Sequence, residues 1–551
     1  MITLLTLLFT VYSTFGYKMA IFVLDLSNSQ LLFNERVAET LAEAGHDVTL
    51  VMIISQSDRD NSDIKIKSNV KLHVVNAPIN FTRKEMEKRQ EELTFKPSTY
   101  NMVSRLSAQT SMIVDTCRAT LENKQLLQWL KEQHFDLAFA HMFDVCAVGL
   151  VHAAEIPSWI WLNSGPVIDY VAYLIGLPII PSYTPPIMMA AVGEMNFLQR
   201  VKSLIGHGMM KLFWRRLIAD PETQLFRTHI SPEFPDLMDL AAKCPLVMAN
   251  TNELYDMPRP TLAKVVNIGG VGVEIKDQKP LPNVALSYFF PKNQYFNVST
   301  FQHIAEIVDS GDGTIFFSFG SVVASYKMPL EWKKIFLDTF RRFPKYQFLW
   351  RYEEDDIKDM LPSNVHLFKW LPQVDLLRHP RTKAFITHAG YNSFQEAILT
   401  GVPLIAIPLV GDQPKNAASA EHLGIGVVLN KGELSVSVVS RAIEEVITNT
   451  RYKKEARRLS RMVGNKPVTP TQLLVKWSEF VAEFQTLDNL VPAGTKLNFI
   501  QYHSLDVIFC LFLLVILILA LIRFLFKLAI RGTFALVMLW PSFRSEKQKT
   551  M

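Results

Sequence analysis

A short stretch in the second half of the chain carries side chains that are suited to a phosphorylated ligand. An apolar run at 383–387 is followed by His388 and Gly390, and a helix is predicted to begin near Tyr391. The first N–H groups of a helix have no partner inside it, and small neighbouring residues let an anion approach them closely. The stretch therefore predicts a cradle for a diphosphate, with His388 at its mouth.

Other side chains near this cradle are suited to a nucleotide and a sugar. Asn392 and Glu396 are four residues apart and share a helical face, so the first can donate to a phosphate while the second accepts from ribose hydroxyls. Trp370 can stack on a base, and Asp412 with Gln413 offers acceptors and donors for vicinal sugar hydroxyls. Each residue type alone is common in cores and loops, but the spacing of the whole set is specific.

The elements that must position these side chains alternate in type twice along the chain. Short apolar runs alternate with helical patterns, which is typical of a doubly wound parallel sheet. In the first half the runs extend from 19–24 to 245–251, and in the second from 314–321 to 426–430. A stretch rich in Gly, Pro and charge at 266–283 is predicted to link the halves, so a ligand cleft is expected between two similar domains.

Composition limits the class of protein. The 551 residues favour two or three domains, and 49% hydrophobic with 20% charged residues indicates a globular or membrane-attached chain. A net charge of +5 on this length gives no argument for nucleic-acid binding. The four cysteines show no CxxC spacing, so neither a disulfide framework nor a zinc site is predicted.

Both ends of the chain carry predicted membrane signals. Residues 1–16 resemble a cleaved secretory signal, although no Lys or Arg precedes the apolar core; an uncleaved anchor or a buried first strand is the alternative. Residues 505–522 are long and apolar enough to cross a bilayer, with a buried globular helix as the alternative. Basic residues follow this span, which predicts a cytosolic tail and a lumenal bulk. The final KQKTM has the KxKxx spacing of a receptor-read retrieval signal for the endoplasmic reticulum.

Two internal segments interrupt the alternating pattern, and each has two interpretations. Residues 284–302 show no periodicity and are either a translated intron of whole-codon length or a surface insertion with a glycosylation acceptor at Asn297. Residues 170–215 alternate apolar and Pro-rich pieces, and form either a lipid-facing or acceptor-binding surface or part of an ordinary core.

Taken together, the motifs resemble those of a known family. The second half reproduces the signature of the UDP-glycosyltransferases, and nearly the whole chain resembles their animal membrane-bound branch, the UDP-glucuronosyltransferases. The resemblance includes AEAGHDVT (42–49), SFGS (318–321), the anchor and the lysine tail. The signature residues are Trp370, Gln373, His388, Gly390, Asn392, Glu396, Asp412 and Gln413. The resemblance implies a GT-B fold of two Rossmann-like domains facing a cleft, and an inverting, metal-independent transfer from a UDP-sugar co-substrate without a cofactor.

The resemblance also implies a division of the chain and a set of partners. The predicted parts are a signal peptide (1–16), an N-terminal acceptor-binding Rossmann-like domain (17–265), a linker with an insertion (266–302), a C-terminal UDP-sugar-binding Rossmann-like domain (303–490), a juxtamembrane segment (491–504), a transmembrane helix (505–522) and a cytosolic basic tail (523–551). The expected partners are UDP-glucose or UDP-glucuronic acid, a small lipophilic acceptor, and related transferases in a homo- or hetero-oligomer, with no nucleic acid. The expected location is the endoplasmic reticulum membrane, as a single-pass type I glycoprotein with lumenal catalytic domains and a role in detoxification.

Each matching residue has an implied role. Trp370 stacks on uracil, Glu396 binds the ribose, and Asp412 with Gln413 holds the sugar. Gln373 belongs to the same donor site, and Arg351 matches a position near the uridine. The diphosphate is held by His388, Asn392 and the turn at Gly320 and Ser321, and Gly390 and Ser393 belong to the same donor site.

The chain departs from the family pattern at the catalytic base. The family places a histidine in the first strand–helix loop and an orienting carboxylate at the end of the fourth strand, but Gln30 and His141 stand at these two positions. Glutamine does not accept a proton at neutral pH. Asp144 follows His141 by three residues, and if a helix begins there the two side chains share a face, so that Asp144 can orient His141.

Several interpretations of this departure stay open. The chain is an enzyme in which His141, with or without Asp144, serves as base, or an enzyme whose acceptors, such as acidic phenols or carboxylic acids, need little base assistance. Alternatively, it is a UDP-sugar-binding partner of an active relative, without transfer activity of its own. A lumenal single-pass receptor or adhesion protein is a further class, although such ectodomains are usually stabilised by disulfides.

Overall fold

The computed structural model describes residues 16–25, 28–56, 69–79, 102–273, 298–320 and 323–547, together with isolated positions between 58 and 95. Residues 1–491 form one compact unit and residues 492–551 form a second. Ser321, the core of the predicted signal, the predicted glycosylation acceptor Asn297 and a second Asn-x-Thr sequence at Asn80 lie outside the described residues, as does most of the KQKTM tail.

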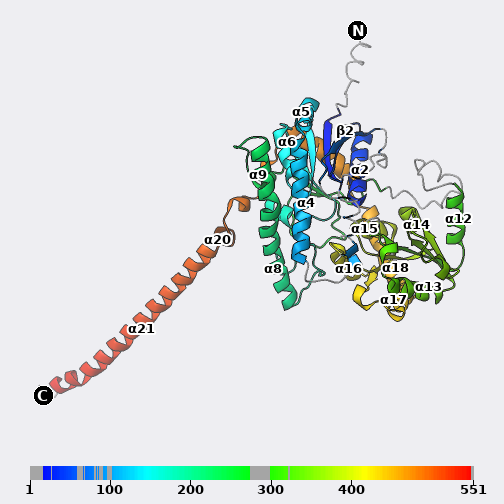
Figure 1. Ribbon diagram of the computed structural model, residues 1–551. Helices are drawn as coiled ribbons and strands as arrows, with labels where there is room; N and C mark the ends of the chain where they lie inside the picture. The colour runs from blue at the N-terminus through cyan, green and yellow to red at the C-terminus, as the bar shows by residue number, and fades with distance from the viewer. Residues whose placement is uncertain are drawn as a thin grey trace, which may run out of the picture. The chain divides into compact units, whose positions relative to one another are not determined.

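The first half of the larger unit is built on a parallel seven-stranded sheet, in the order β3-β2-β1-β4-β5-β6-β7 (Figure 1). Its strands are β1 (Lys18–Leu24), β2 (Asp47–Ile54), β3 (Lys71–Asn76), β4 (Leu137–His141), β5 (Trp159–Asn163), β6 (Leu246–Ala249) and β7 (Val265–Asn267). All but the last coincide with predicted runs. Strand β7 was missed because its three residues are too few for a pattern, and it overlaps the start of the predicted linker.

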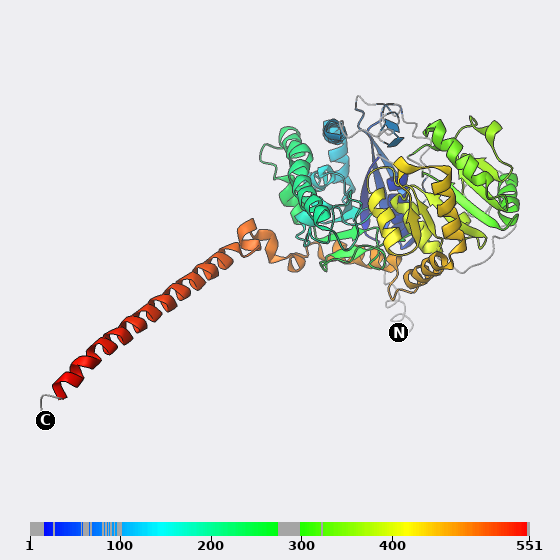
Figure 2. The same cartoon turned by 90° about the horizontal axis from the view of Figure 1, so that it is seen from below.

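The second half of the unit is built on a parallel six-stranded sheet, in the order β10-β9-β8-β11-β12-β13. Its strands are β8 (Gly313–Ser318), β9 (Tyr346–Arg351), β10 (Val365–Phe368), β11 (Thr382–Thr387), β12 (Leu404–Ala406) and β13 (Gly426–Val428). Every one was predicted from its apolar run. The prediction of two doubly wound parallel sheets is therefore confirmed, and Figure 2 shows the first sheet (blue) beside the second half (green to yellow).

Both faces of each sheet are buried, as continuous apolar strands require. In β1, Ala20 and Phe22 belong to the core on one face, whereas Met19 and Ile21 belong to the core on the other. This alternation follows from the two-residue period of a strand. Helices cover both faces of the sheets. Ligands can therefore reach the ends of the strands but not the faces of the sheets.

Helices connect the strands in both halves. Those of the first half are α2 (Asn28–Glu43), α4 (Met102–Glu122), α5 (Lys124–Gln133), α6 (Cys146–Ala153), α7 (Asp169–Leu174), α8 (Phe197–Trp214), the π-helical turn Arg215–Ala219, α9 (Asp220–His229) and α10 (Leu237–Ala242). Those that follow are α12 (Val298–Asp309), α13 (Leu330–Arg341), α14 (Gln373–Arg378), α15 (Tyr391–Thr400), α16 (Gln413–His422), α17 (Val436–Thr448), α18 (Thr450–Gly464) and α19 (Pro470–Phe484). The last residues of the 284–302 block open α12, and its earlier residues lie outside the described chain.

Helix α19 returns from the second half to the first sheet. Its side chains Leu474 and Val481 are fully buried in the same core as Met19 and Ile21 of β1. The Ser158 hydroxyl just before β5 also donates a hydrogen bond of 2.6 Å to the Gln485 carbonyl oxygen. The chain therefore crosses between the two halves twice, once after β7 and once before α19. The sequence did not indicate the second crossing.

A disulfide joins Cys117 of α4 to Cys146 at the start of α6, with their Cα atoms 5.8 Å apart. The cysteine spacing, from which no disulfide framework was predicted, did not reveal this bond. The two residues are separated by 29 positions and belong to no spacing motif, so only the packing of α4 against the first turn of α6 brings them together. Cys244 and Cys510 are free.

The second unit consists of the short helix α20 (Phe499–Tyr502) and the long helix α21 (Leu505–Lys547). Residues Leu505–Ala535 of α21 are long and apolar enough to cross a membrane, and their most apolar window of 18 residues has a mean hydropathy of 3.3. The candidate span therefore begins where it was predicted. It continues as helix beyond residue 522, because apolar residues such as Phe524 and Leu528 follow the first basic side chains.

Candidate active site

The predicted diphosphate cradle lies at the start of α15, directly after β11. Gly390 precedes the first helical turn, and no side chain caps the helix there. Ala389 has a φ of 60°, which is the left-handed region that L-residues rarely adopt. The turn thus presents the first backbone N–H groups of α15 without a side-chain cap, which is the arrangement that binds anions.

Two glycines hold the ring of His388. A Cβ on Gly320, after β8, would lie 2.6 Å from His388 Cε1, and a Cβ on Gly390 would lie 2.4 Å from His388 Nε2. Neither position accepts a larger residue without moving the ring. Burial, reinforced by the charge of Arg351, lowers the pKa of His388 to about 3. The imidazole is therefore neutral at pH 7 before a ligand binds, and in this form it can meet a phosphate as a hydrogen-bond donor.

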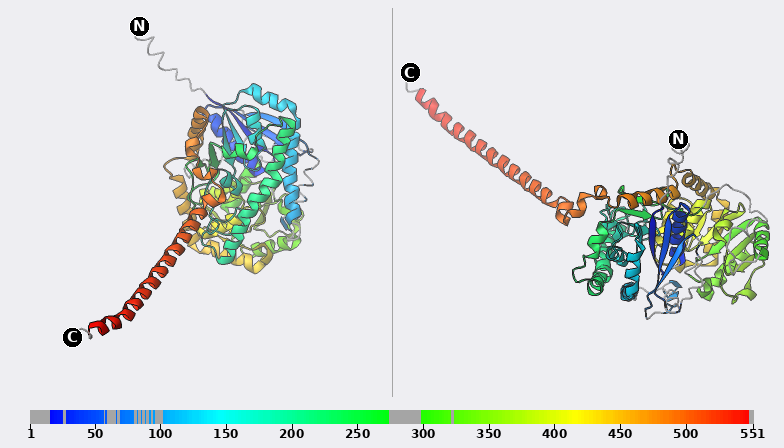
Figure 3. Two further views of the ribbon diagram at one scale, coloured as in Figure 1. Left: turned by 90° about the vertical axis from the view of Figure 1, so that its left-hand side faces the viewer. Right: turned by 90° about the horizontal axis from the view of Figure 1, so that it is seen from above.

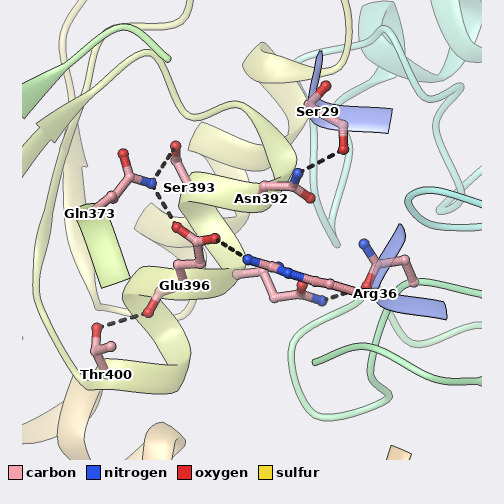
Figure 4. Close-up of polar contacts among 9 residues, drawn as sticks. Ser29, Arg36, Gln373, Asn392, Ser393, Glu396 and Thr400 are labelled. Atoms are coloured by element: carbon pink, nitrogen blue, oxygen red, sulfur yellow. Dashed lines mark hydrogen bonds and ion pairs between the residues drawn. The ribbon is translucent and has the colours of Figure 1, made fainter. Parts of the chain in front are cut away.

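Glu396 lies at the deep end of the same helix face and has partners from both halves (Figure 4). Gln373 Nε2 donates 2.8 Å to Glu396 Oε2 and 3.1 Å to the Ser393 hydroxyl oxygen. On the other side, an Arg36 guanidinium nitrogen of α2 lies 3.3 Å from Glu396 Oε1. The carboxylate is 6% exposed, so ribose hydroxyls that reach it must share it with Arg36 and Gln373.

Helix α2 approaches α15 at a second point, close to the predicted seat of the base. Asn392 Nδ2 donates 3.1 Å to the carbonyl oxygen of Ser29, the residue before Gln30 (Figure 4). The Gln30 carbonyl accepts from Asn34 Nδ2 at 2.8 Å, as expected within a helix. Ser29 and Gln30 lie in the first turn of α2, and not in a loop as predicted from the sequence. This turn contacts α15 through Asn392, so Gln30 stands next to the cradle.

Trp370 and Arg351 form a platform near the cradle. Trp370 is 43% exposed, and the guanidinium carbon of Arg351 lies 4.9 Å from the centroid of its ring. An exposed indole with a cation over one face can stack a base on its other face. Because Arg351 also acts electrostatically on His388, the platform and the cradle are close to each other.

Asp412 and Gln413 are close to the cradle and are already engaged with the protein. Gln413 Oε1 accepts the N–H groups of Leu409 and Val410 at 2.8 and 2.9 Å, so its amino group is the part suited to a sugar hydroxyl. Asn416 Nδ2 donates to Asp412 Oδ2 at 2.7 Å and to the Ala389 carbonyl oxygen at 3.0 Å. Asn416, which the sequence did not single out, thus ties the sugar end of the site to the turn of the cradle.

His141 ends strand β4, and Asp144 lies in the loop that follows. The condition set for the pair, a helix that begins at His141, is not met, because α6 begins only at Cys146. The loop still brings His141 Nε2 within 3.7 Å of Asp144 Oδ1, while the Phe143 N–H points to His141 Nδ1 at 3.4 Å. His141 is 5% exposed, so an acceptor that uses this base must enter the first half and displace part of its cover.

A second carboxylate that sequence reasoning missed lies beside this pair. Glu222 of α9 is fully buried and accepts the Val145 N–H at 3.0 Å, while Asp144 accepts the Cys146 N–H at 3.0 Å. Burial raises the pKa of Asp144, and burial together with repulsion from Asp144 raises that of Glu222 well above its usual value. Both acids therefore cap the start of α6, directly behind His141. No local pattern marked Glu222, since it is 77 positions from Val145.

The family model described as UDP-glucoronosyl and UDP-glucosyl transferase matches residues 19–535 of the chain. The chain belongs to this family. Putative UDP-glucuronosyltransferase ugt-46 of Caenorhabditis elegans is 30% identical to this UDP-glycosyltransferase family member over 510 residues, with coverage of 91% of this chain and 92% of that protein. UDP-glucuronosyltransferase 1A7 of Rattus norvegicus is 29% identical over 504 residues, with coverage of 90% and 89%.

Two solved structures share the fold of this family member. The structure of Phytolacca americana UGT2 with UDP-2fluoro-glucose and pterostilbene has a TM-score of 0.54 and 15% identity, and covers 84% of this chain and 99% of that chain. The glycotransferase of kitacinnamycin has a TM-score of 0.53 and 16% identity, and covers 85% and 98%. They confirm the predicted GT-B fold.

The structure gathers most of the predicted donor residues of this family member around one helix. Those that it brings together on or next to α15 are Gln373, His388, Gly390, Asn392, Ser393, Glu396, Gly320, Asp412 and Gln413. Their roles toward UDP stay predictions. Arg36, which pairs with Glu396, was not among the predicted donor-site residues. Its position on the helix that contains Gln30 was the only indication in the sequence.

Replacing Trp370 by alanine is expected to weaken UDP binding by roughly 5- to 150-fold, since stacking on an aromatic side chain is worth about 1–3 kcal/mol per base. The matched control is Trp332→Ala, which removes a half-buried indole of α13 outside the cradle. Titration of both variants with UDP by calorimetry checks the prediction. An unchanged affinity in Trp370→Ala would remove this residue from the site.

Proposed function

We propose that this chain transfers a hexosyl group from UDP-glucose or UDP-glucuronic acid to a small lipophilic acceptor, with inversion and without a metal ion. The observation that carries the proposal is the contact of Asn392 with the carbonyl of Ser29. It joins α15 of one half to the first turn of α2 in the other half, which contains Gln30 at the position where the family places its base. A reacting sugar held on α15 would therefore lie at the carboxyl edge of the first sheet, where acceptors are expected.

In the proposed reaction the acceptor oxygen attacks the anomeric carbon from the face opposite UDP, and the bond from that carbon to the phosphate oxygen breaks. Negative charge grows on the β-phosphate, where His388, Asn392 and the start of α15 are placed to donate. Donors already aimed at a developing charge are worth about 3 kcal/mol each. Among the described residues no group of three or more His, Cys, Asp and Glu side chains could hold a metal ion. The proposal assigns charge stabilisation to these donors.

We assign the acceptor proton to His141. The imidazolium formed would be stabilised by Asp144, 3.7 Å away, and Asp144 would be held by the Cys146 N–H. Strands β1 and β4 are neighbours in a parallel sheet, so His141 and the start of α2, which contains Gln30, lie at the same edge. His141 can thus act where the family histidine is missing.

We further propose that the larger unit is lumenal in the endoplasmic reticulum, with α21 as its single span. The Cys117–Cys146 disulfide supports an oxidising compartment. The basic residues Arg523, Lys527 and Arg531 follow the most apolar part of α21, which supports a cytosolic carboxyl end. The retrieval signal, glycosylation and oligomerisation stay expectations.

Microsomes that contain the chain test the proposal with a panel of UDP-sugars and a simple phenol as acceptor. The expected product is a β-linked glycoside with UDP-glucose or UDP-glucuronic acid, formed equally well in the presence of a chelator. Binding of UDP without any product would favour the alternative of an inactive partner, which the presence of Gln30 supports. Absence of UDP binding would contradict the transferase account altogether.

A further inference from the structure

Helix α8 carries its large apolar side chains on the outside of the molecule. It lies along the outer side of the first half, away from the second sheet (Figures 1 and 3). Leu198, Ile205 and Leu212 follow one another at two-turn spacing and therefore share a face, and they are 69%, 56% and 61% exposed. Phe197 and Leu204 beside them are 69% and 64% exposed. An ordinary surface helix buries such a stripe.

The face of α8 that meets the protein carries small and polar residues along most of its length, and Trp214 stacks on Tyr170 in the core at its last residue. Ser203 is fully buried, and a Cβ on Gly206 would lie 2.9 Å from Pro186 Cγ. His207 Nε2 lies 2.8 Å from the Thr184 carbonyl oxygen. Close contacts along the face that contains Ser203, Gly206 and His207 thus fix the helix on the protein. The outward apolar side chains are therefore not displaced core residues. This resolves the two interpretations of 170–215: α7 belongs to the core, whereas α8 presents a surface.

The charge on α8 has one sign. The helix contains Arg200, Lys202 and Lys211 and no acidic residue. Apolar side chains on one face with Lys and Arg at the flanks are typical of helices that lie in the interface of a bilayer, where the basic groups meet anionic headgroups. A protein partner would need a matching acidic and apolar groove, whereas a bilayer offers both features over any area.

The chain itself keeps a bilayer within reach of α8. The larger unit ends at Val491 and the candidate span begins at Leu505. Residues 492–504 extend over at most roughly 45 Å when fully stretched. We propose that the outward face of α8 docks on the membrane in which α21 is anchored, with the helix in the headgroup region. This docking proposal does not depend on the proposed transferase activity.

A cleavable full-length chain tests the docking. A protease site is inserted within 492–498, the chain is reconstituted into vesicles of phosphatidylcholine with 30% phosphatidylserine, and the site is cut before flotation. The expected result is that the released unit floats with the vesicles, and that Leu198→Asp, Ile205→Asp and Leu212→Asp together lower the bound fraction more than tenfold. High salt or pure phosphatidylcholine is expected to weaken binding of the parent chain.

The control variant combines Leu72→Asp, Leu330→Asp and Met462→Asp, which alter exposed apolar residues elsewhere (39%, 54% and 39% exposed) and should leave flotation unchanged. UDP binding by both triple variants reports that they are folded. The proposal is overturned if the cut parent unit leaves the vesicles, or if the α8 variant stays bound as well as the parent. Release of the parent as a dimer that the α8 variant does not form would also overturn it, and would assign the face to a second copy.

Discussion

Replacing Glu396 by alanine is expected to weaken UDP binding at least a hundredfold. In the proposed complex this carboxylate accepts two ribose hydroxyls, and hydrogen bonds to a charged group are worth about 1.5–3 kcal/mol each. Its two oxygens are held in place by Gln373 and Arg36, so the acceptor geometry exists before the nucleotide arrives. Titration with UDP, followed by calorimetry, measures the loss.

Two further variants separate ribose binding from the contact between the halves. Arg36→Ala removes the same cross-half ion pair but leaves the carboxylate in place, so it should weaken UDP binding much less than Glu396→Ala. Glu421→Ala, on the exposed side of the neighbouring helix α16, should have no effect. If Arg36→Ala and Glu396→Ala reduced the affinity equally, the ion pair and not the ribose would account for the role of Glu396.

Replacing His141 by alanine is expected to lower turnover by about 10² to 10⁴, which is the usual worth of general-base assistance. UDP affinity should stay unchanged, because His141 belongs to the first sheet and makes none of the contacts of α15 described above. Gln30→Ala should lower turnover less, since glutamine does not accept the proton. Initial rates at saturating donor, set beside UDP titrations, measure both effects.

The histidine variants need a matched control and a gain-of-function partner. His152→Ala removes an exposed histidine of α6 and should leave the rate unchanged. A strong increase of turnover in Gln30→His would show that the native chain is limited at proton transfer. If His141→Ala and Gln30→Ala both matched the parent, the substitute base would be excluded, and acceptors that need little base assistance would account for any transfer.

Much of the fold followed from the sequence because long apolar runs bounded by helical patterns have few other solutions. The strands before His141 and His388 were found in this way, and the donor side chains followed because they sit on one helix at fixed spacing. Strand β7 and the packing of α19 against the first sheet were missed because neither has a distinctive sequence pattern. Three residues carry no period, and an amphipathic helix does not indicate which sheet will bury it.

The parts of the site that depend on distant residues were not predictable. Cys117 meets Cys146, Arg36 meets Glu396, and Glu222 caps the loop of Asp144, each across a long separation and without a motif. The approach of His141 to Asp144 was anticipated from a helical spacing that does not exist. The loop that follows β4 brings His141 and Asp144 together instead. Glu222 of α9 adds a second buried carboxyl group beside Asp144.

The account rests on transfer of a sugar from UDP by this chain, and isotope labelling tests that claim most directly. The parent chain in microsomes is incubated with UDP-glucose or UDP-glucuronic acid that is uniformly labelled with ¹³C in the hexose, and with a phenolic acceptor. The predicted result is an acceptor glycoside that carries the full hexose label, and loss of that product in Glu396→Ala. Binding of UDP with no labelled glycoside from either donor would contradict it.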